Sequence, residues 1–332
     1  DEDIDLAMDV LNDMFFESLF DEKEIEKEKR VVIEEIKMYE DSPDEIIHDL
    51  FSDYVWNDHP LGRPILGTEE SIKGLTREKI LTYMDQHYAP DNLVIAVAGK
   101  IKHEDVLNKL APVYGQFKRG GRRVLEGTPV GRKVQKMIPR DTEQMHLIVG
   151  VPGLGQEDKD LYPMHIINNI LGGGLSSRLF QEIREQRGMA YTVFSYHSTY
   201  VDTGLFAIYA GTTPTNSQEV VECILAEILD IKRNGITAAE LERTKSQIKG
   251  GLYLGLESAN SRMSRLGKTE LTYNRVISPE EVVEKLEQVT IEDVQRVVNQ
   301  LFTRDRISLL MLGPAGNEVD VEATLAKIGW TD

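Results

Sequence analysis

An internal repeat is the sequence feature that most constrains the fold of this chain. Residues 76–99 align without a gap with residues 290–313, and in both copies a helical pattern is followed by a turn and an apolar run. The apolar runs, Leu93–Ala98 and Ile307–Leu312, have the length and composition of buried β-strands. The sequence therefore predicts an α+β fold made of two homologous domains. The identical residues in the first copy are Thr76, Glu78, Gln86, Asp91 and Gly99.

The two copies do not begin at the same point. Glu24–Lys27 aligns with Glu240–Arg243 at almost the same offset, but the chain starts at Asp1, inside the amphipathic helical pattern of residues 4–19. We therefore expect the first domain to lack its N-terminal part. Residues 1–120 are predicted to be the remainder of the N-terminal domain, 121–136 a linker, and 137–332 the C-terminal domain.

The predicted linker lies in a basic, glycine-containing stretch, residues 117–140. A nucleic-acid patch is the alternative interpretation, but aromatic residues are not interleaved with the basic ones. The formal net charge of −18 also argues against nucleic-acid or anionic-membrane partners. The single cysteine, Cys223, excludes an internal disulfide and a cysteine-based zinc site. This fits a reducing compartment such as the bacterial cytoplasm, which we expect, or a protein that does not use disulfides.

Other elements follow from periodicity and turn signals. Ser42 followed by Pro43 and Glu45 predicts a helix start with a capping box. Strands are expected at Met145–Val151 and in a hairpin over residues 191–209 that turns at 202–204. Further helices are expected at residues 24–40, 76–88, 104–114, 160–171, 177–186, 216–233, 238–256, 279–286 and 290–301.

Two acids fall inside the apolar stripe of the helix that begins near Glu24. Glu28 and Glu35 are seven residues apart, about 20° short of two full turns, so they share one side of the helix. A carboxylate on an apolar face is costly unless a metal, a cation or hydrogen-bond donors meet it. Two interpretations follow. In the first, one or both acids reach solvent or pair with an Arg; in the second, Glu35 binds a metal and Glu28 supports the site.

The second copy of the repeat bears on that choice. When Glu24–Lys27 is aligned with Glu240–Arg243, Glu28 corresponds to Thr244 and Glu35 to Gly251. The second copy therefore has the helix but not the two acids. Carboxylates with a purely structural role are expected in both copies. The difference therefore favours a functional pair in the first copy.

A second candidate constellation lies in residues 179–191. A helix carrying Arg184 is expected to end at Gly188, and Tyr191 begins the following strand. Arg184 and Tyr191 could converge on one point as two strong hydrogen-bond donors. The alternative is that Arg184 forms a surface ion pair and Tyr191 packs in the core.

These two stretches resemble one known family. Residues 28–35 with Tyr39-Glu-Asp-Ser-Pro43, and Ser177-Arg-Leu-Phe-Gln-Glu-Ile-Arg184 with Gly188-Met-Ala-Tyr191, are similar to the pitrilysin/insulinase family of zinc metallopeptidases. The most similar branch is that of bacterial enzymes related to mitochondrial processing peptidase. The resemblance runs in order along essentially the whole chain. It implies two domains, each an antiparallel sheet packed against helices.

The resemblance also implies roles for matching residues. Glu35 matches the family's downstream zinc ligand, and Glu28 matches a supporting acid. Arg184 and Tyr191 match residues that hold the substrate backbone and stabilise the oxyanion. The implied activity is zinc-dependent (Zn2+) endopeptidase cleavage of peptides or unfolded segments between two domains, with a homodimer or a related partner subunit.

The chain departs from the family in one respect: the zinc motif His-x-x-Glu-His is absent. In relatives this motif lies upstream of the helix that begins here. We therefore expect these 332 residues alone neither to hold zinc tightly nor to cleave peptides. The alternative is a non-catalytic partner or scaffold subunit, because some family members have lost the motif.

Overall fold

The computed structural model describes residues 2–57, 59–117 and 127–331, and the chain divides into two compact units. Helices α2 (Glu22–Glu40) and α9 (Ala238–Gly255) each contribute residues to both units. The predicted domain boundaries 1–120, 121–136 and 137–332 follow the sequence repeat, whereas the two units follow contacts in space. The boundaries therefore stay a prediction. Part of the predicted linker, residues 118–126, lies outside the described residues. The first unit comprises Asp1–Lys37, Leu66–Gly127 and Gly251–Pro279, and the second comprises Met38–Ile65, Thr128–Gly250 and Glu280–Asp332.

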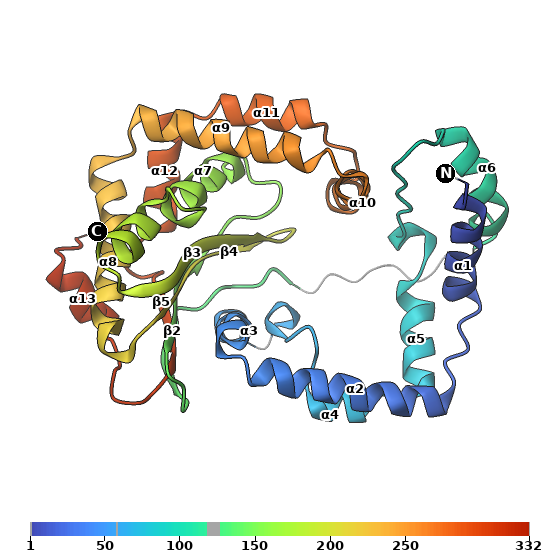
Figure 1. Ribbon diagram of the computed structural model, residues 1–332, viewed down its shortest axis with the longest axis horizontal. Helices are drawn as coiled ribbons and strands as arrows, with labels where there is room; N and C mark the ends of the chain where they lie inside the picture. The colour runs from blue at the N-terminus through green and yellow to red at the C-terminus, as the bar shows by residue number, and fades with distance from the viewer. Residues whose placement is uncertain (1, 58, 118–126, 332) are drawn as a thin grey trace. The chain divides into compact units, whose positions relative to one another are not determined.

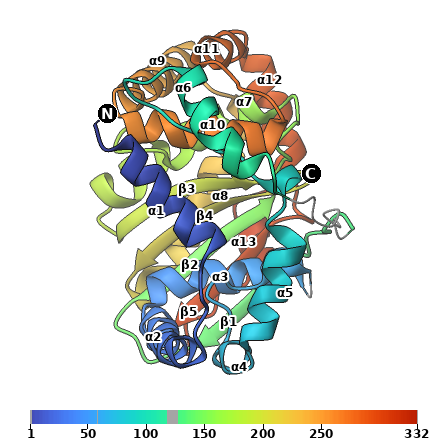
Figure 2. The same ribbon diagram turned by 90° about the vertical axis from the view of Figure 1, so that its right-hand side faces the viewer.

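The second unit is built on a five-stranded sheet with the strand order β1-β5-β2-β4-β3 (Figures 1 and 2). Strand β1 runs parallel to β5, whereas the other neighbouring pairs are antiparallel. The predicted mixed α/β class, the strand near Met145 and the hairpin are confirmed, but the expected antiparallel sheet has a parallel edge. The strands are β1 (Gln135–Pro139), β2 (Met145–Pro152), β3 (Ala190–Thr199), β4 (Gly204–Thr212) and β5 (Ser308–Gly313).

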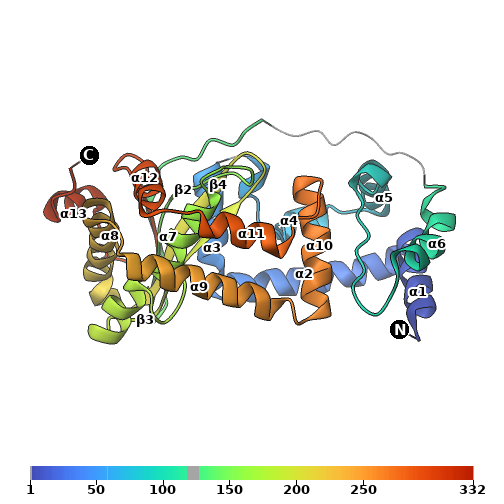
Figure 3. The same ribbon diagram turned by 90° about the horizontal axis from the view of Figure 1, so that it is seen from above.

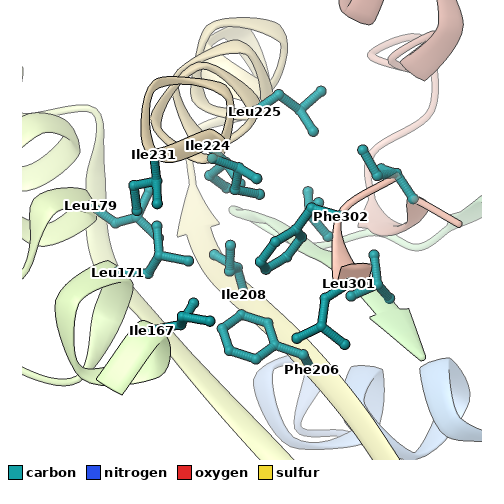
Figure 4. Close-up of a cluster of buried hydrophobic side chains, with 14 of the residues drawn as sticks. Ile167, Leu171, Leu179, Phe206, Ile208, Ile224, Leu225, Ile231, Leu301 and Phe302 are labelled. Atoms are coloured by element: carbon teal, nitrogen blue, oxygen red, sulfur yellow. The ribbon is translucent and has the colours of Figure 1, made fainter. Parts of the chain in front are cut away.

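Helices cover one face of this sheet and enclose the main core. The rings of Phe206 on β4 and Phe302, which follows α12, meet edge to face with centroids 5.3 Å apart (Figure 4). Helix α13 packs beside α8 (Figure 3). Strands β2 and β4 are almost continuously apolar, because the opposite face of the sheet is also covered, as described below. The helices of this layer are α7 (Leu161–Gly172), α8 (Ser217–Asn234), α11 (Pro279–Glu287), α12 (Ile291–Leu301) and α13 (Val321–Lys327).

Helix α3 (Pro43–Trp56) covers the opposite face with Ile47, Phe51 and Val55. The contact is close at Gly150 of β2, where a Cβ atom would come within 2.7 Å of the Phe51 ring. A side chain at this position would therefore push α3 off the sheet.

The start of α3 was predicted correctly, but its cap was not. Ser42 occupies the N-cap position, yet its hydroxyl donates to the Met38 carbonyl oxygen at 3.0 Å and no side-chain cap forms. The end of α2 is only two residues away, so its last carbonyl groups compete for this hydroxyl. The expected capping box is therefore wrong.

The first unit contains helices and connecting segments but no strands within its described residues. Leu93–Ala98, predicted to be a strand, has no strand assignment, although the backbone at Leu93 is extended. A strand requires a neighbour that completes its hydrogen bonds. The equivalent segment of the second copy, β5, has β1 and β2 as neighbours. The helices are α1 (Ile4–Phe16), α4 (Glu69–Lys73), α5 (Arg77–His87), α6 (His103–Tyr114) and α10 (Ala259–Tyr273), of which α4 and α10 were not predicted.

Candidate functional site

Arg184 lies on a π-helix, η3 (Phe180–Gln186), in the second unit. Single π-helical turns are rare and often occur at functional sites. Leu179 and Ile183 are fully buried in the main core and fix this segment to the sheet. Phe180 and Arg184 are only half-buried, so they border the surface.

Arg178 anchors the start of this segment. Its guanidinium donates to the carboxylate of Glu240 on α9 at 2.7 and 3.1 Å and to Asp230 on α8 at 2.7 Å. Burial acts to raise the pKa of Glu240, but hydrogen bonds from Arg178 and Thr237 outweigh it and lower the pKa to about 2. The network ties η3 to two helices of the main core.

Arg187 anchors the other end of the segment. It donates to Glu182 from Nε at 2.7 Å and lies 3.3 Å from Glu219 on α8. Gly188 follows with φ of +60°, a left-handed conformation that favours glycine, and the chain turns into β3. The predicted helix end at Gly188 is confirmed.

The side chain of Arg184 lies between two aromatic rings. Its Cζ atom is 4.9 Å from the centroid of Phe180 and 5.1 Å from that of Tyr191. Both distances fall within the range of cation–π attraction. Among the described residues no Asp or Glu forms an ion pair with Arg184, and the neighbouring Glu182 is bound by Arg187. The alternative of a surface ion pair is wrong for the described chain.

Tyr191 lies at an irregularity of the sheet. Ala190 pairs with Thr212 and Thr192 pairs with Gly211, so Tyr191 has no partner on β4. Such a bulge reorients the side chain of the extra residue. The Tyr191 side chain is 74% exposed, which excludes the alternative of a core position. The structure thus brings Arg184 and Tyr191 together, as predicted.

Phe180 is the member of this group that sequence reasoning missed. The available signal was its position four residues before Arg184, the spacing at which helical side chains meet. The bulge at Tyr191 could not be found in the same way, because it depends on the register between β3 and β4.

The two candidate acids of α2 lie on one side of the helix but are exposed. This contradicts the expectation that Glu28 and Glu35 sit on a buried face. The stripe itself is partly confirmed, since Ile36 is buried and Tyr39 is half-buried. Thr244, at the position equivalent to Glu28, is buried in α9. The roles of Glu28 and Glu35 stay proposals.

The other acids between the two ends of α2 differ from Glu28 and Glu35 because each has a lysine partner. Lysines three residues later bind Glu24, Glu26 and Glu34 at 2.5, 2.5 and 2.8 Å. No ion pair to Glu28 or Glu35 occurs within the described chain. Among the acids between the two ends of α2, Glu28 and Glu35 are therefore the ones without a cationic partner in the described chain.

A complete metal site is not present in the described part of the chain. No group of three or more His, Cys, Asp or Glu side chains there could hold a metal ion. Catalytic zinc takes three protein ligands and a water molecule. Glu35 supplies one exposed carboxylate, so the residues at hand do not by themselves fit a zinc ion.

Partly buried histidines make hydrogen-bonding contacts elsewhere in the second unit. His165 Nδ1 lies 2.8 Å from His197 Nε2, between α7 and β3. Burial, and then the neighbouring His197, lowers the pKa of His165 to about 4. On α3, His48 contacts the Tyr196 hydroxyl of β3 at 2.7 Å, and burial lowers the pKa of His48. These neutral groups stabilise the packing of two helices on the sheet.

None of the helices within residues 2–57, 59–117 and 127–331 is long and apolar enough to cross a membrane.

Two family models match this sequence. Residues 1–69 match the model described as insulinase (peptidase family M16), and residues 74–248 match the peptidase M16 inactive domain. The second match contains Arg184 and Tyr191, and the first contains Glu28 and Glu35.

Solved structures share the fold. The peptidase M16 inactive domain from Pseudomonas fluorescens has a TM-score of 0.84 at 22% identity and covers 93% of this chain and 74% of its own. A protease from Helicobacter pylori has a TM-score of 0.87 at 21% identity and covers 94% of this chain and 78% of its own.

Curated relatives are also similar in sequence. The uncharacterized zinc protease YmxG of Bacillus subtilis is 44% identical over 96% of this chain and 77% of its own length. An uncharacterized zinc protease of Streptomyces coelicolor is 38% identical over 95% of this chain and 70% of its own. With both family models and these relatives in agreement, the chain belongs to peptidase family M16, the insulinase family.

Proposed function

We propose that this chain is the substrate-binding part of a zinc-dependent endopeptidase that hydrolyses peptides or unfolded segments in a cleft between two domains. The chain lacks the His-x-x-Glu-His part of the site. By itself it therefore binds substrate without cleaving it.

One observation carries this proposal: the uncompensated Arg184 guanidinium lies beside the exposed Tyr191 phenol. Arg offers five N–H donors and Tyr one O–H donor, which suit the carbonyl oxygens of a peptide backbone. Donors fixed in advance stabilise the negative charge that develops on such an oxygen during hydrolysis. We assign substrate binding and oxyanion stabilisation to both residues.

Glu35 is the proposed metal ligand and Glu28 its supporting acid. Two observations support these roles: both residues lie on the same side of α2, and neither has a lysine partner among the described residues. Because one carboxylate does not make a zinc site, the remaining ligands must come from outside this sequence.

The test compares two proteins: the 332-residue chain, and the same chain joined to an N-terminal segment that carries His-x-x-Glu-His. The joined protein is expected to bind zinc and to hydrolyse a quenched fluorogenic peptide until a chelator is added. Glu35→Gln should remove both properties, whereas the matched control Glu34→Gln should keep them. Zinc content by mass spectrometry and hydrolysis rate are the measurements.

Two results would contradict the proposal. Tight zinc binding by the chain alone would show that its own residues complete a site. Unchanged zinc binding in Glu35→Gln would refute the ligand assignment.

The second candidate function is a non-catalytic partner or scaffold subunit. The absence of His-x-x-Glu-His from the sequence favours it. A joined protein that binds zinc and peptide but never cleaves would support this alternative.

The proposed assembly is a homodimer or a complex with a related subunit, and the proposed compartment is the bacterial cytoplasm. The bacterial origin of the relatives and the single cysteine support the compartment. Sedimentation of the chain at several concentrations would test the assembly.

A further inference from the structure

We infer that Phe180 is a positioning residue that holds the Arg184 guanidinium in place for substrate. This inference rests on the proposed function of Arg184. Three features carry it: the ring contact, the lack of a carboxylate paired with Arg184 among the described residues, and the attachment of η3 to the second unit.

The first feature is the double ring contact. Arg184 Cζ lies 4.9 Å from the Phe180 centroid and 5.1 Å from the Tyr191 centroid. Tyr191 is 74% exposed and sits on a bulge, so by itself it would hold the guanidinium weakly. Phe180 is half-buried and lies on the same short helix as Arg184, which makes it the firmer of the two contacts.

The second feature is the charge around Arg184. A carboxylate partner would also fix a guanidinium, but it would occupy the N–H donors that a peptide carbonyl needs. An aromatic ring attracts the cation through its face and leaves the N–H groups in the guanidinium plane free. Among the described residues no carboxylate pairs with Arg184, and that of Glu182, two residues earlier, is bound by Arg187.

The third feature is the attachment of η3 at both ends. Arg178 binds Glu240 and Asp230, and Arg187 binds Glu182 and Glu219. The helix backbone is therefore held whatever residue occupies position 180. Since Phe180 lies outside the main core, its replacement is expected to change the Arg184 side chain and not the fold.

The test uses Phe180→Leu, which removes the ring, and Phe180→Tyr, which keeps it. In the 332-residue chain labelled with ¹⁵N-arginine, the Arg184 Nε–H resonance is assigned with Arg184→Lys. Ring currents should displace this resonance in the parent chain and in Phe180→Tyr. In Phe180→Leu it should move toward the position of an exposed arginine, with the melting temperature unchanged.

A second measurement uses the joined protein described above. Phe180→Leu should lower kcat/KM about two- to fivefold, the size expected for one cation–π contact, and Phe180→Tyr should restore it. An Arg184 resonance that is unaffected by Phe180→Leu would overturn the inference, whether or not the joined protein is active. Absence of peptidase activity with the expected resonance shifts would instead contradict the proposed function alone.

Discussion

The guanidinium carbon of Arg184 lies 5.1 Å from the centroid of the Tyr191 ring, although one residue belongs to a π-helix and the other to a bulged strand. Two local irregularities thus meet at one point. A regular helix or a regular strand would place these side chains differently, because each irregularity changes the direction of the residues beside it.

Replacing Tyr191 by Phe keeps the ring beside Arg184 and removes the hydroxyl donor. If the phenol stabilises the oxyanion, kcat of the joined protein should fall about 10²- to 10³-fold, as is typical for the loss of one oxyanion donor. KM should change little. Steady-state hydrolysis of a fluorogenic peptide measures both constants, and Phe16→Leu, distant in sequence and outside the second unit, serves as a control for general damage. An unchanged kcat would leave Tyr191 with a binding role only.

Replacing Arg178 by Lys should destabilise the second unit. The Arg178 and Glu240 side chains are 18% and 14% exposed, and lysine cannot reproduce the two-pronged contact. Lysine keeps the positive charge but cannot make all of the hydrogen bonds to Glu240 and Asp230, so the expected loss of unfolding free energy is about 1.5–3 kcal/mol. Tryptophan fluorescence during urea unfolding reports this unit, because Trp56 and Trp330 are both buried in it.

The matched control for Arg178→Lys is Lys327→Gln. It removes an ion pair with Glu222 in which Lys327 is 66% exposed, so the expected loss is at most about 1 kcal/mol. Equal effects of the two substitutions would mean that the Arg178 network does not anchor η3.

The histidine pair predicts a pH dependence of stability. The pKa of His165 is about 4 in the folded chain, below its ordinary value of 6.5. Between these values the unfolded chain binds more protons than the folded chain, so stability is complete above about pH 6.5 and is lost as the pH falls toward 4. This difference between the two pKa values corresponds to about 3 kcal/mol of unfolding free energy.

His165→Gln should therefore flatten the loss of unfolding free energy between pH 7 and pH 5, measured by urea titration. His103→Gln, at an exposed position, should not. If the unfolding free energy fell equally with pH in the parent chain, His165→Gln and His103→Gln, the His165–His197 pair would be excluded as the cause.

Much of the second unit could be predicted from the sequence alone. Buried apolar runs such as Met145–Val151 and Ile307–Leu312 form strands because their side chains can be buried on both faces. The helix limits at Thr290 and Gly188 follow from local cap and turn chemistry. Arg184 and Tyr191 could be identified because they lie only seven positions apart in the sequence.

The tertiary structure decided what depends on partners distant in sequence. Leu93–Ala98 and Ile307–Leu312 are equivalent in the repeat, yet within the described parts of the chain strands that complete the hydrogen bonds lie beside the second segment and not beside the first. The exposure of Glu28 and Glu35 likewise depends on what packs against α2, which periodicity cannot specify. Local sequence fixes which residues can form an element, whereas pairing and burial are properties of the neighbours that the folded chain brings to it.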